Sequence, residues 1–304
     1  MTHQLLTDGG LETELIFNRG LDLPEFAAFP LVDTDEGRDT LRSYYAAYVR
    51  IAVRAQVPML LETPTWRANP DHGAALGYDA TALDRLNRRS VELMNEIANE
   101  HDDELVGWQV GGILGPRGDG YLAAGGVDPA EAASYHRPQL AAFAAAGADR
   151  ATVLTLTDVG EGIGIARAAA DVGLPVVIGF TVETDGRLPD GSPLAAAIEA
   201  VDATAAPSYF LINCAHPTHI THAVDDGAWQ QRIGGLRVNA STMSHAELDV
   251  AEELDDGDPA RLATDQLPLL TAFPNLEVLG GCCGTDARHV AEMWGVGERP
   301  RAVS

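Results

Sequence analysis

Apolar residues in this chain gather in short runs that alternate with longer segments of helical periodicity. The short runs are rich in Val, Ile and Leu, a composition typical of parallel strands that are buried on both faces. Each run ends at polar or glycine-rich residues, which mark the end of a strand. The pattern predicts strands over residues 4–7, 57–62, 104–110, 151–156, 175–180, 209–213, 233–238 and 276–280.

The segments between these runs predict helices. In the first, Leu41, Tyr45, Tyr48 and Ala52 fall on one face of a helix. The stretch from residue 10 to 30 is rich in Gly, Pro and aromatic residues and is predicted to be irregular, and the acidic segment 247–258 is predicted to be solvated. The predicted helices cover 36–56, 80–99, 129–147, 161–173, 193–204, a segment beginning near Pro217, 259–272 and 285–294.

Eight strand–helix units in 304 residues predict an α/β protein folded as a (β/α)8 TIM barrel. Such barrels usually take about 250 residues plus insertions. A doubly wound open sheet is the alternative, but no GxGxxG or P-loop motif follows any predicted strand. Because no linker or low-complexity segment interrupts the alternation, we expect one domain over residues 1–304.

Composition and charge indicate in which environment the protein works and which classes of partner it lacks. The mean hydropathy is -0.04, and no apolar run approaches the ~20 residues of a membrane span. The first residues lack the basic and apolar regions of a signal peptide, so we expect a cytoplasmic protein. The formal charge of -25 argues against nucleic acid and anionic membranes as partners. All 20 basic residues are arginine, and salt adaptation or a GC-rich genome would each explain this composition.

The three cysteines carry the most distinctive chemistry. Cys214, Cys282 and Cys283 all lie where a predicted strand ends, and their odd number argues against a disulfide framework. Thiolates suit zinc, and three protein ligands with one open position are typical of a catalytic zinc site. Glycines on both sides of the Cys282–Cys283 pair allow the backbone to turn, so that both sulfurs can face one ion. We therefore hypothesise a Zn²⁺ site.

Two other interpretations of the cysteines are open. Free cysteine often behaves as a small buried apolar residue. A redox pair would require a strained disulfide between neighbours. His216 and His219 follow Cys214 closely, but they fall at a helix start with a proline and are interpreted as surface groups or neighbours of the site instead of ligands.

Barrel geometry extends the candidate site beyond the cysteines. Active sites of these barrels lie at the carboxyl ends of the strands. Asp8, Thr63 and Asn239 end the first, second and seventh predicted strands and are candidate substrate-binding residues. Trp66 follows Thr63 and could contact a cationic donor, although ordinary packing is the favoured interpretation.

These motifs resemble the homocysteine S-methyltransferase family over residues 5 to 294. The similarity rests on Asp8-Gly9-Gly10, Asn213-Cys214 and Gly281-Cys282-Cys283-Gly284. It implies a (β/α)8 barrel whose three cysteines bind zinc, with a small-molecule thiol and a methyl donor as partners. The thiolate of homocysteine would attack the methyl group of S-methylmethionine, S-adenosylmethionine or betaine, giving methionine. The resemblance also implies that Asp8, Gly9 and Gly10 bind substrate and that Asn239 lines the pocket.

The chain departs from the family pattern at the fourth strand. There the family usually has a glutamate that binds the amino group of homocysteine, whereas this chain has Thr155, a neutral hydrogen-bonding residue, and Asp158 three residues later. A second departure is the glycine-rich stretch 111–117. A barrel acting on another thiol, or a non-catalytic member that binds zinc or thiols, is therefore the alternative function.

Overall fold

Eight parallel strands close into a barrel in the computed structural model, which describes residues 4–123 and 125–297. Consecutive strands pair in chain order, and β8 pairs with β1 to complete the ring. The TIM barrel is confirmed, and the open sheet is wrong. The strands are β1 Leu5–Leu6, β2 Met59–Glu62, β3 Trp108–Leu114, β4 Arg150–Leu156, β5 Val176–Phe180, β6 Tyr209–Asn213, β7 Ile233–Val238 and β8 Val278–Gly281.

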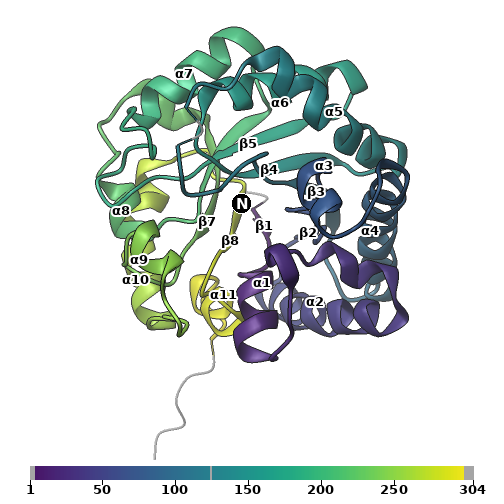
Figure 1. Cartoon of the computed structure of the whole chain (residues 1–304). Coiled ribbons are helices and arrows are strands. Elements are labelled where there is room, and N and C mark those ends of the chain that lie inside the picture. Colours follow the sequence, from purple (N-terminus) through teal and green to yellow (C-terminus); the bar gives the residue numbers. More distant parts are fainter. Residues whose placement is uncertain (1–3, 124, 298–304) are drawn as a thin grey trace, which may run out of the picture.

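Helices surround the barrel (Figure 1). Side-chain caps begin several of them: Asp128 accepts hydrogen bonds from two backbone amides of α5, and Asp258 caps α10. The helices are α1 Leu11–Thr13, α2 Asp35–Ala55, α3 Pro70–Ala75, α4 Ala80–Glu100, α5 Pro129–Ala145, α6 Val159–Val172, α7 Leu194–Ala205, α8 Pro217–Thr221, α9 His245–Asp249, α10 Pro259–Ala272 and α11 Ala287–Met293, with short 3-10 or π turns at Glu14–Asn18, Pro24–Phe26, Phe29–Asp33 and Ala228–Arg232.

The third strand begins later than the sequence predicts. Residues 104–107 form a turn after α4, in which Val106 is exposed, and β3 starts at Trp108. Gly111 and Gly112 lie inside β3 and not in a loop after it. A Cβ at Gly112 would lie 2.3 Å from the ring of Phe143 on α5, so the helix can pack this closely only against a glycine. Close helix–strand packing, not a chain turn, therefore explains this glycine pair.

The segment after β1 also differs from the prediction of irregular structure. Residues 11–13 form α1 and residues 14–18 continue as a π-helical turn. Leu11 and Leu15 are buried four residues apart, which is the spacing of one helical face. This helical segment carries the chain over the carboxyl end of the barrel.

The barrel and its helices contain two clusters of buried apolar side chains. The larger apolar cluster lies between the barrel and the helices, whereas a smaller cluster fills the centre. This inner cluster separates the two ends of the barrel into independent surfaces. Among the described residues, no helix is both long enough and apolar enough to cross a membrane. The inner cluster consists of Leu5, Leu60, Ile113, Leu154, Val177, Tyr209, Leu211 and Val278.

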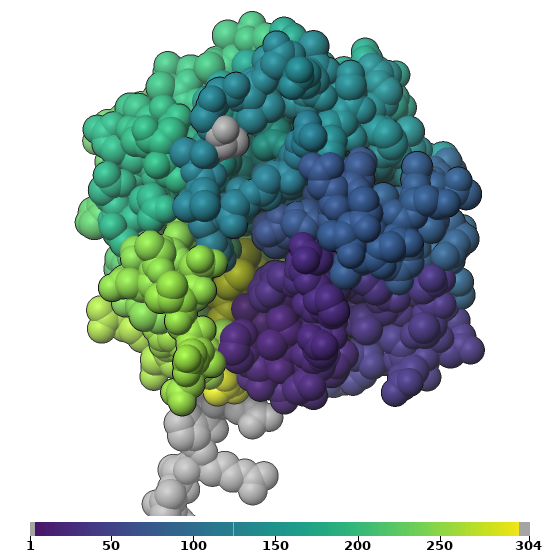
Figure 2. Space-filling view, viewed as in Figure 1, coloured from purple at the N-terminus to yellow at the C-terminus, as the bar shows by residue number. Residues whose placement is uncertain are grey.

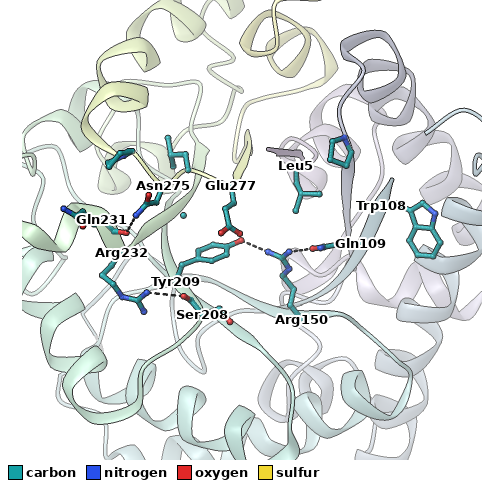
Figure 3. A pocket seen from close by; sticks show the side chains of 14 residues that line it. Leu5, Trp108, Gln109, Arg150, Ser208, Tyr209, Gln231, Arg232, Asn275 and Glu277 are labelled. Atoms are coloured by element: carbon teal, nitrogen blue, oxygen red, sulfur yellow. Dashed lines mark hydrogen bonds between the residues drawn. The ribbon is translucent and has the colours of Figure 1, made fainter. Parts of the chain in front are cut away.

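A cavity of about 780 Å³ lies at the amino-terminal end of the barrel (Figure 3). In it, Arg150 donates a 2.6 Å hydrogen bond to the Tyr209 hydroxyl and another to Gln109. Residues at the first positions of the strands line this cavity, whereas barrel active sites lie at the opposite end. We therefore place the candidate site at the carboxyl end, where the cysteines lie.

Candidate metal and substrate site

Three cysteine sulfurs meet at the carboxyl ends of β6 and β8. The Sγ atoms of Cys214, Cys282 and Cys283 lie within 4.8 Å of one another, and those of Cys214 and Cys283 are 3.6 Å apart. A tetrahedral zinc with Zn–S bonds of about 2.3 Å would separate its sulfurs by roughly 3.8 Å, so the donor set fits this metal. The cluster is the metal-ligating group found among residues 4–123 and 125–297.

Unusual backbone conformations bring the sulfurs together. Cys214 has a φ of 56°, in the left-handed region, and Gly284 has a φ of 77°. The Cys282 amide donates to Val238 O at 2.8 Å, and the Ala240 amide donates to Cys283 O at 3.2 Å, so the end of β7 and the residues after it hold the cysteine pair. Strand ends with left-handed turns therefore direct neighbouring side chains to one point.

The cysteine cluster favours a single negative charge in the absence of metal. Hydrogen bonds from the thiols of Cys214 and Cys283 hold the pKa of Cys282 well below its usual range. The pKa values of Cys214 and Cys283 are raised, because each thiol interacts with its charged neighbour and is buried. A cysteine binds a metal ion as the thiolate, so a metal bound by all three sulfurs would displace the remaining thiol protons.

A cavity of about 370 Å³ opens above the sulfurs. In Figure 2, the yellow C-terminal part of the described chain is visible in a hollow between the purple N-terminal segment and the green segment around α9 and α10. Residues of the segment 247–258 line the cavity, so this segment is not simply solvated as predicted. The lining includes Thr13, Phe17, Phe26, Trp66, Arg67, Asp119, Tyr121, Leu154, Thr155, Cys214, Asn239, Ser241, Leu248, Asp249, Glu253, Leu254, Asp255, Cys282 and Cys283.

Tyr121 covers the open side of the cysteine cluster. Its hydroxyl lies 3.2 Å from Cys214 Sγ and 3.6 Å from Cys283 Sγ. The ring stacks on His245 with centroids 4.3 Å apart, and His245 Nε2 lies 2.8 Å from Cys214 O. Sequence reasoning missed both residues, because Tyr121 lies in a loop and His245 begins α9, so neither lies at a strand end. The only sequence signal is an aromatic residue within the glycine-rich stretch after β3.

Two buried carboxylates hold the loop that carries Tyr121. At its start, the Arg117 amide donates to Glu161 Oε1 at 2.7 Å, and the same oxygen lies 2.8 Å from His136 Nε2. At its end, the amides of Gly126 and Val127 donate to Asp158 Oδ2 at 3.0 and 3.2 Å. The loop is therefore fixed at both ends, which positions the phenol over the sulfurs.

Asp8 lies in a buried network that sequence reasoning did not anticipate. Arg237 on β7, only 4% exposed, donates to Asp8 Oδ1 at 2.5 Å and also to Glu62. Tyr44 donates to Asp8 Oδ2 at 3.0 Å. Burial raises the pKa of Asp8 to about 6 although Arg237 opposes the shift. Burial by itself would lower the pKa of Arg237. The negative charges of Asp8 and Glu62 outweigh this effect, so the pKa of Arg237 is raised above its usual value.

Gly9 and Gly10 connect this network to the cysteines. A Cβ at Gly10 would lie 2.5 Å from Cys282 O, and one at Gly9 would lie 2.7 Å from the Tyr48 hydroxyl. Arg237 donates to Gly9 O at 3.1 Å and to Gly281 O at 3.0 Å. Glycine is thus required for the close approach of the two strand ends. Asp8, Gly9 and Gly10 are buried and do not line the cavity.

The remaining candidates divide between the cavity and the core. Thr155 and Asn239 line the cavity. Thr155 has a φ of 65°, and its amide donates to Asn213 Oδ1 at 2.8 Å. Thr63, in contrast, is buried outside the cavity. Its hydroxyl shares a 2.6 Å hydrogen bond with the Thr65 hydroxyl and accepts a hydrogen bond from the Ile113 amide. Trp66 lines the cavity and packs edge-on against Phe26.

The histidines after Cys214 are buried and serve local structure. His216 caps α8 and is 3% exposed, and His219 lies 3.1 Å from Thr242 O. Burial lowers the pKa of His216 to about 4 and also lowers the pKa of His219. The interpretation as surface groups is therefore wrong, while neither residue belongs to the metal-ligating cluster of the described chain.

Solved structures with the same fold include one enzyme in two forms. The crystal structure of the homocysteine methyltransferase MmuM from Escherichia coli in its metallated form superposes with a TM-score of 0.74, at 22% identity and 96% coverage of each chain. Its oxidised form gives a TM-score of 0.76 at 23% identity, again with 96% coverage of each chain. At this identity, the superposition shows the shared barrel.

Sequence comparison gives the family. The homocysteine S-methyltransferase of Escherichia coli (strain K12) is 26% identical over 309 residues, which cover 95% of this chain and 94% of that protein. The sequence profile of the family "Homocysteine S-methyltransferase" matches residues 5–295. Because this match spans nearly all of the 304 residues, the chain belongs to the homocysteine S-methyltransferase family.

Proposed function

We propose that this enzyme transfers a methyl group from a small onium donor to the thiolate of homocysteine, with zinc held by Cys214, Cys282 and Cys283. The observation that carries the proposal is the cluster of three sulfurs within 4.8 Å beneath a cavity large enough for two small substrates. When bound, zinc lowers the pKa of a coordinated thiol, so that the substrate reacts as a thiolate at neutral pH. We also propose that residues 1–304 form one domain and work in the cytoplasm, whose thiol pool keeps cysteines reduced.

The residues of the chain orient the reaction. Thr155 and Asn239 line the cavity, and Asn239 donates to Cys214 O at 3.1 Å, which fixes the turn that bears this ligand. The Oδ1 atom of Asn239 is buried and has no partner among the described residues, so it could accept a hydrogen bond from a substrate once the groups that cover it move. The buried Asp8, Gly9 and Gly10 hold the strand end beside Cys282 and support the site from below.

The upper part of the cavity suits a cationic methyl donor. Phe26 and Trp66 give it an aromatic wall, and aromatic faces attract onium groups. Arg67 already lies over the Trp66 ring, 4.1 Å from its centroid, so a cationic donor would have to use the Phe26 ring or the other face of Trp66. The donor would approach the thiolate from this wall, so that sulfur, methyl group and leaving atom are in line. S-methylmethionine, S-adenosylmethionine and betaine all fit this description.

Access to the cysteine cluster requires a movement of Tyr121. Its hydroxyl occupies the side of the sulfurs that faces the cavity. The acceptor sulfur must take this place, and the surrounding loop then excludes water from the reacting atoms.

The alternative function is a barrel that binds zinc but acts on another thiol or on none. The neutral Thr155 at the fourth strand end favours this alternative, since it offers no charge to an amino acid.

One experiment separates the two functions. Zinc content of the reduced protein is measured, and homocysteine is then titrated while zinc-edge X-ray absorption follows the metal. We expect one zinc per chain, one added sulfur ligand, and methionine formation with at least one of the three donors. Zinc without an added sulfur would favour the alternative, and a chain that binds no zinc would refute the proposal.

A further inference from the structure

The methyl donors of the proposed function carry a second charged group besides the onium. S-methylmethionine, S-adenosylmethionine and betaine each have a carboxylate. A carboxylate that leaves water for a partly closed cavity needs a cation or hydrogen-bond donors as partners. This inference rests on the proposed function, and it concerns which residue of the cavity supplies that partner.

Arg67 is the only basic side chain among the described residues that line the cavity. It follows the end of β2 and is partly buried. Acids in its surroundings are engaged elsewhere: Glu25 lies 3.3 Å from His72 Nδ1, and Asp119 accepts hydrogen bonds from two backbone amides of its own loop. In the described part of the chain, Arg67 bonds only to a histidine and a carbonyl group, so no carboxylate balances its charge.

These contacts hold one end of the guanidinium and leave the other end open. Nη1 donates to Gly118 O at 2.9 Å and lies 2.8 Å from His72 Nε2, which uses both of its N–H groups. Nε is buried and has no partner within the described chain. Nη2 is neither buried in this way nor hydrogen-bonded to a described residue. Because Arg67 lines the cavity, Nη2 is the donor that a ligand there can use.

Arg67 lies beside the aromatic wall and away from the sulfurs. Its guanidinium carbon is 4.1 Å from the centroid of the Trp66 ring, and Trp66 packs edge-on against Phe26. Its partner Gly118 precedes by three residues Tyr121, whose hydroxyl covers the cysteine cluster. The acceptor thiol must reach the sulfurs, whereas the donor approaches from the aromatic wall. The donor is therefore the substrate whose carboxylate comes next to Arg67.

The charge of Arg67 discriminates among onium compounds. A donor with positive charge alone would be repelled by the guanidinium that covers one face of Trp66. A donor with a carboxylate can place this group against Arg67 while its onium group contacts Phe26 or the other face of Trp66. Partial burial lowers the pKa of Arg67, so an anion beside the guanidinium also offsets part of its lost hydration.

We infer that Arg67 is the specificity residue that binds the carboxylate of the methyl donor. The segment after β2 then supplies both the aromatic contact for the onium group and the charge that selects a donor with a carboxylate. Onium compounds that lack a carboxylate gain nothing from Arg67 and are poor donors.

The test compares donors that differ in the carboxylate. S-adenosylmethionine is paired with its decarboxylated form, S-methylmethionine with (3-aminopropyl)dimethylsulfonium, and betaine with tetramethylammonium. Methionine formation from homocysteine by the zinc-loaded protein gives kcat and KM for both members of each pair. We expect the wild type to prefer the donor with the carboxylate. Arg67→Met should lose about tenfold in kcat/KM for that donor alone, mainly through KM, as for one hydrogen bond to a charged group.

Matched variants separate this role from a structural one. Arg67→Lys keeps the charge but not the planar guanidinium, and it should keep part of the preference. Arg50→Met on α2, an exposed arginine outside the cavity, is the control and should behave as the wild type. Both donors of a pair are measured on the same preparation. Partial unfolding of a variant therefore lowers both rates and leaves their ratio unchanged.

Each other outcome refutes the inference in a recognisable way. A wild type that uses both members of its pair equally has no carboxylate subsite for the donor. If Arg67→Met keeps the full preference, or weakens both donors equally, Arg67 does not bind the donor carboxylate, although the proposed function stands. If Arg67→Met instead abolishes a preference for homocysteine over 3-aminopropane-1-thiol, the carboxylate at Arg67 belongs to the acceptor. If none of the three carboxylate donors gives methionine, the proposed function fails together with this inference.

Discussion

At the scale of single residues, the proposed zinc site requires all three cysteines. Cys282→Ala and Cys214→Ala should each lose zinc and lower methyl transfer by more than about 100-fold, since even outer partners of a metal ligand contribute 10–100-fold. The fold should persist, because Cys214 and Cys282 follow the strands and lie outside the apolar core clusters. Metal analysis and circular dichroism of the purified variants check both parts. Ser134→Ala on α5 is an exposed control, and full turnover without bound zinc would contradict the prediction.

Arg237 carries a second prediction at this scale. Arg237→Met leaves Asp8 without its buried cation, and loss of one partner of a buried ion pair costs about 3–5 kcal/mol. The pKa of Asp8 in the folded state, already about 6, rises further, whereas the unfolded value stays near 3.9. A raised carboxylate pKa stabilises the fold most at low pH, and this contribution is lost as pH rises through the folded pKa.

The destabilisation by Arg237→Met should therefore be larger at pH 8 than at pH 5. Urea unfolding of wild type and variant at both pH values measures the difference. Arg237→Lys, which keeps the charge but not the forked geometry, should recover part of the stability. A loss of stability that is equal at both pH values would show that packing, and not the charge of Asp8, dominates.

At the scale of elements, the sequence predicted most strands and helices but misplaced those set by packing. The strands 209–213 and 233–238 were predicted with their observed bounds, because the first is an apolar run that ends at Asn213 and the second is a mostly apolar run that ends before Asn239. The third strand was predicted too early, since the contact of Gly112 with Phe143 joins residues far apart in the chain. Local periodicity contains no signal for such a contact.

The candidate site shows the same division. Cys214, Cys282 and Cys283 could be found from the sequence because residues at strand ends of a barrel converge by topology alone. Arg237 and Tyr121 could not, because one lies within a strand and the other in a loop whose path depends on Glu161 and Asp158. Pairings of this kind depend on the tertiary fold.

The loop over the cysteine cluster carries the prediction at this scale. Tyr121→Ala removes the ring that stacks on His245 and covers the sulfurs, so the zinc-free thiols should react with iodoacetamide faster, on the order of tenfold. Tyr121→Phe keeps the stacking and should react at a rate near the wild type. Mass spectrometry of alkylated peptides measures the rates. Equal rates in the wild type and both variants would mean that the loop does not control access to the cluster.

At the scale of the whole molecule, the barrel separates its two ends. The apolar side chains in its centre lie between the cysteine cavity and the cavity that contains Arg150 and Tyr209. A change at the amino-terminal end can therefore alter stability without touching the cysteines. Our proposal places the chemistry in the smaller of these two cavities, because the cysteine cluster lines it.

The charge of the whole molecule gives the last prediction. The chain has 45 acidic and 20 basic residues, so 25 carboxylates have no arginine to balance them. Their mutual repulsion destabilises the compact state and is screened once the Debye length falls to about 3 Å in 1 M salt. Raising NaCl from 10 mM to 1 M should therefore increase the melting temperature by roughly 3 °C, equivalent to about 2 kcal/mol in a domain of this size.

Calorimetry in NaCl and in KCl measures this effect, with an uncharged osmolyte as the control for changes in water activity. Surface ion pairs such as Arg85–Asp33 and Arg88–Asp84 weaken in the same salt, but exposed pairs contribute at most about 1 kcal/mol each. Repulsion among the unbalanced carboxylates should outweigh these losses. A melting temperature that falls with salt would contradict this prediction. It would mean that the ion pairs of the arginines stabilise the fold by more than the repulsion among the carboxylates destabilises it.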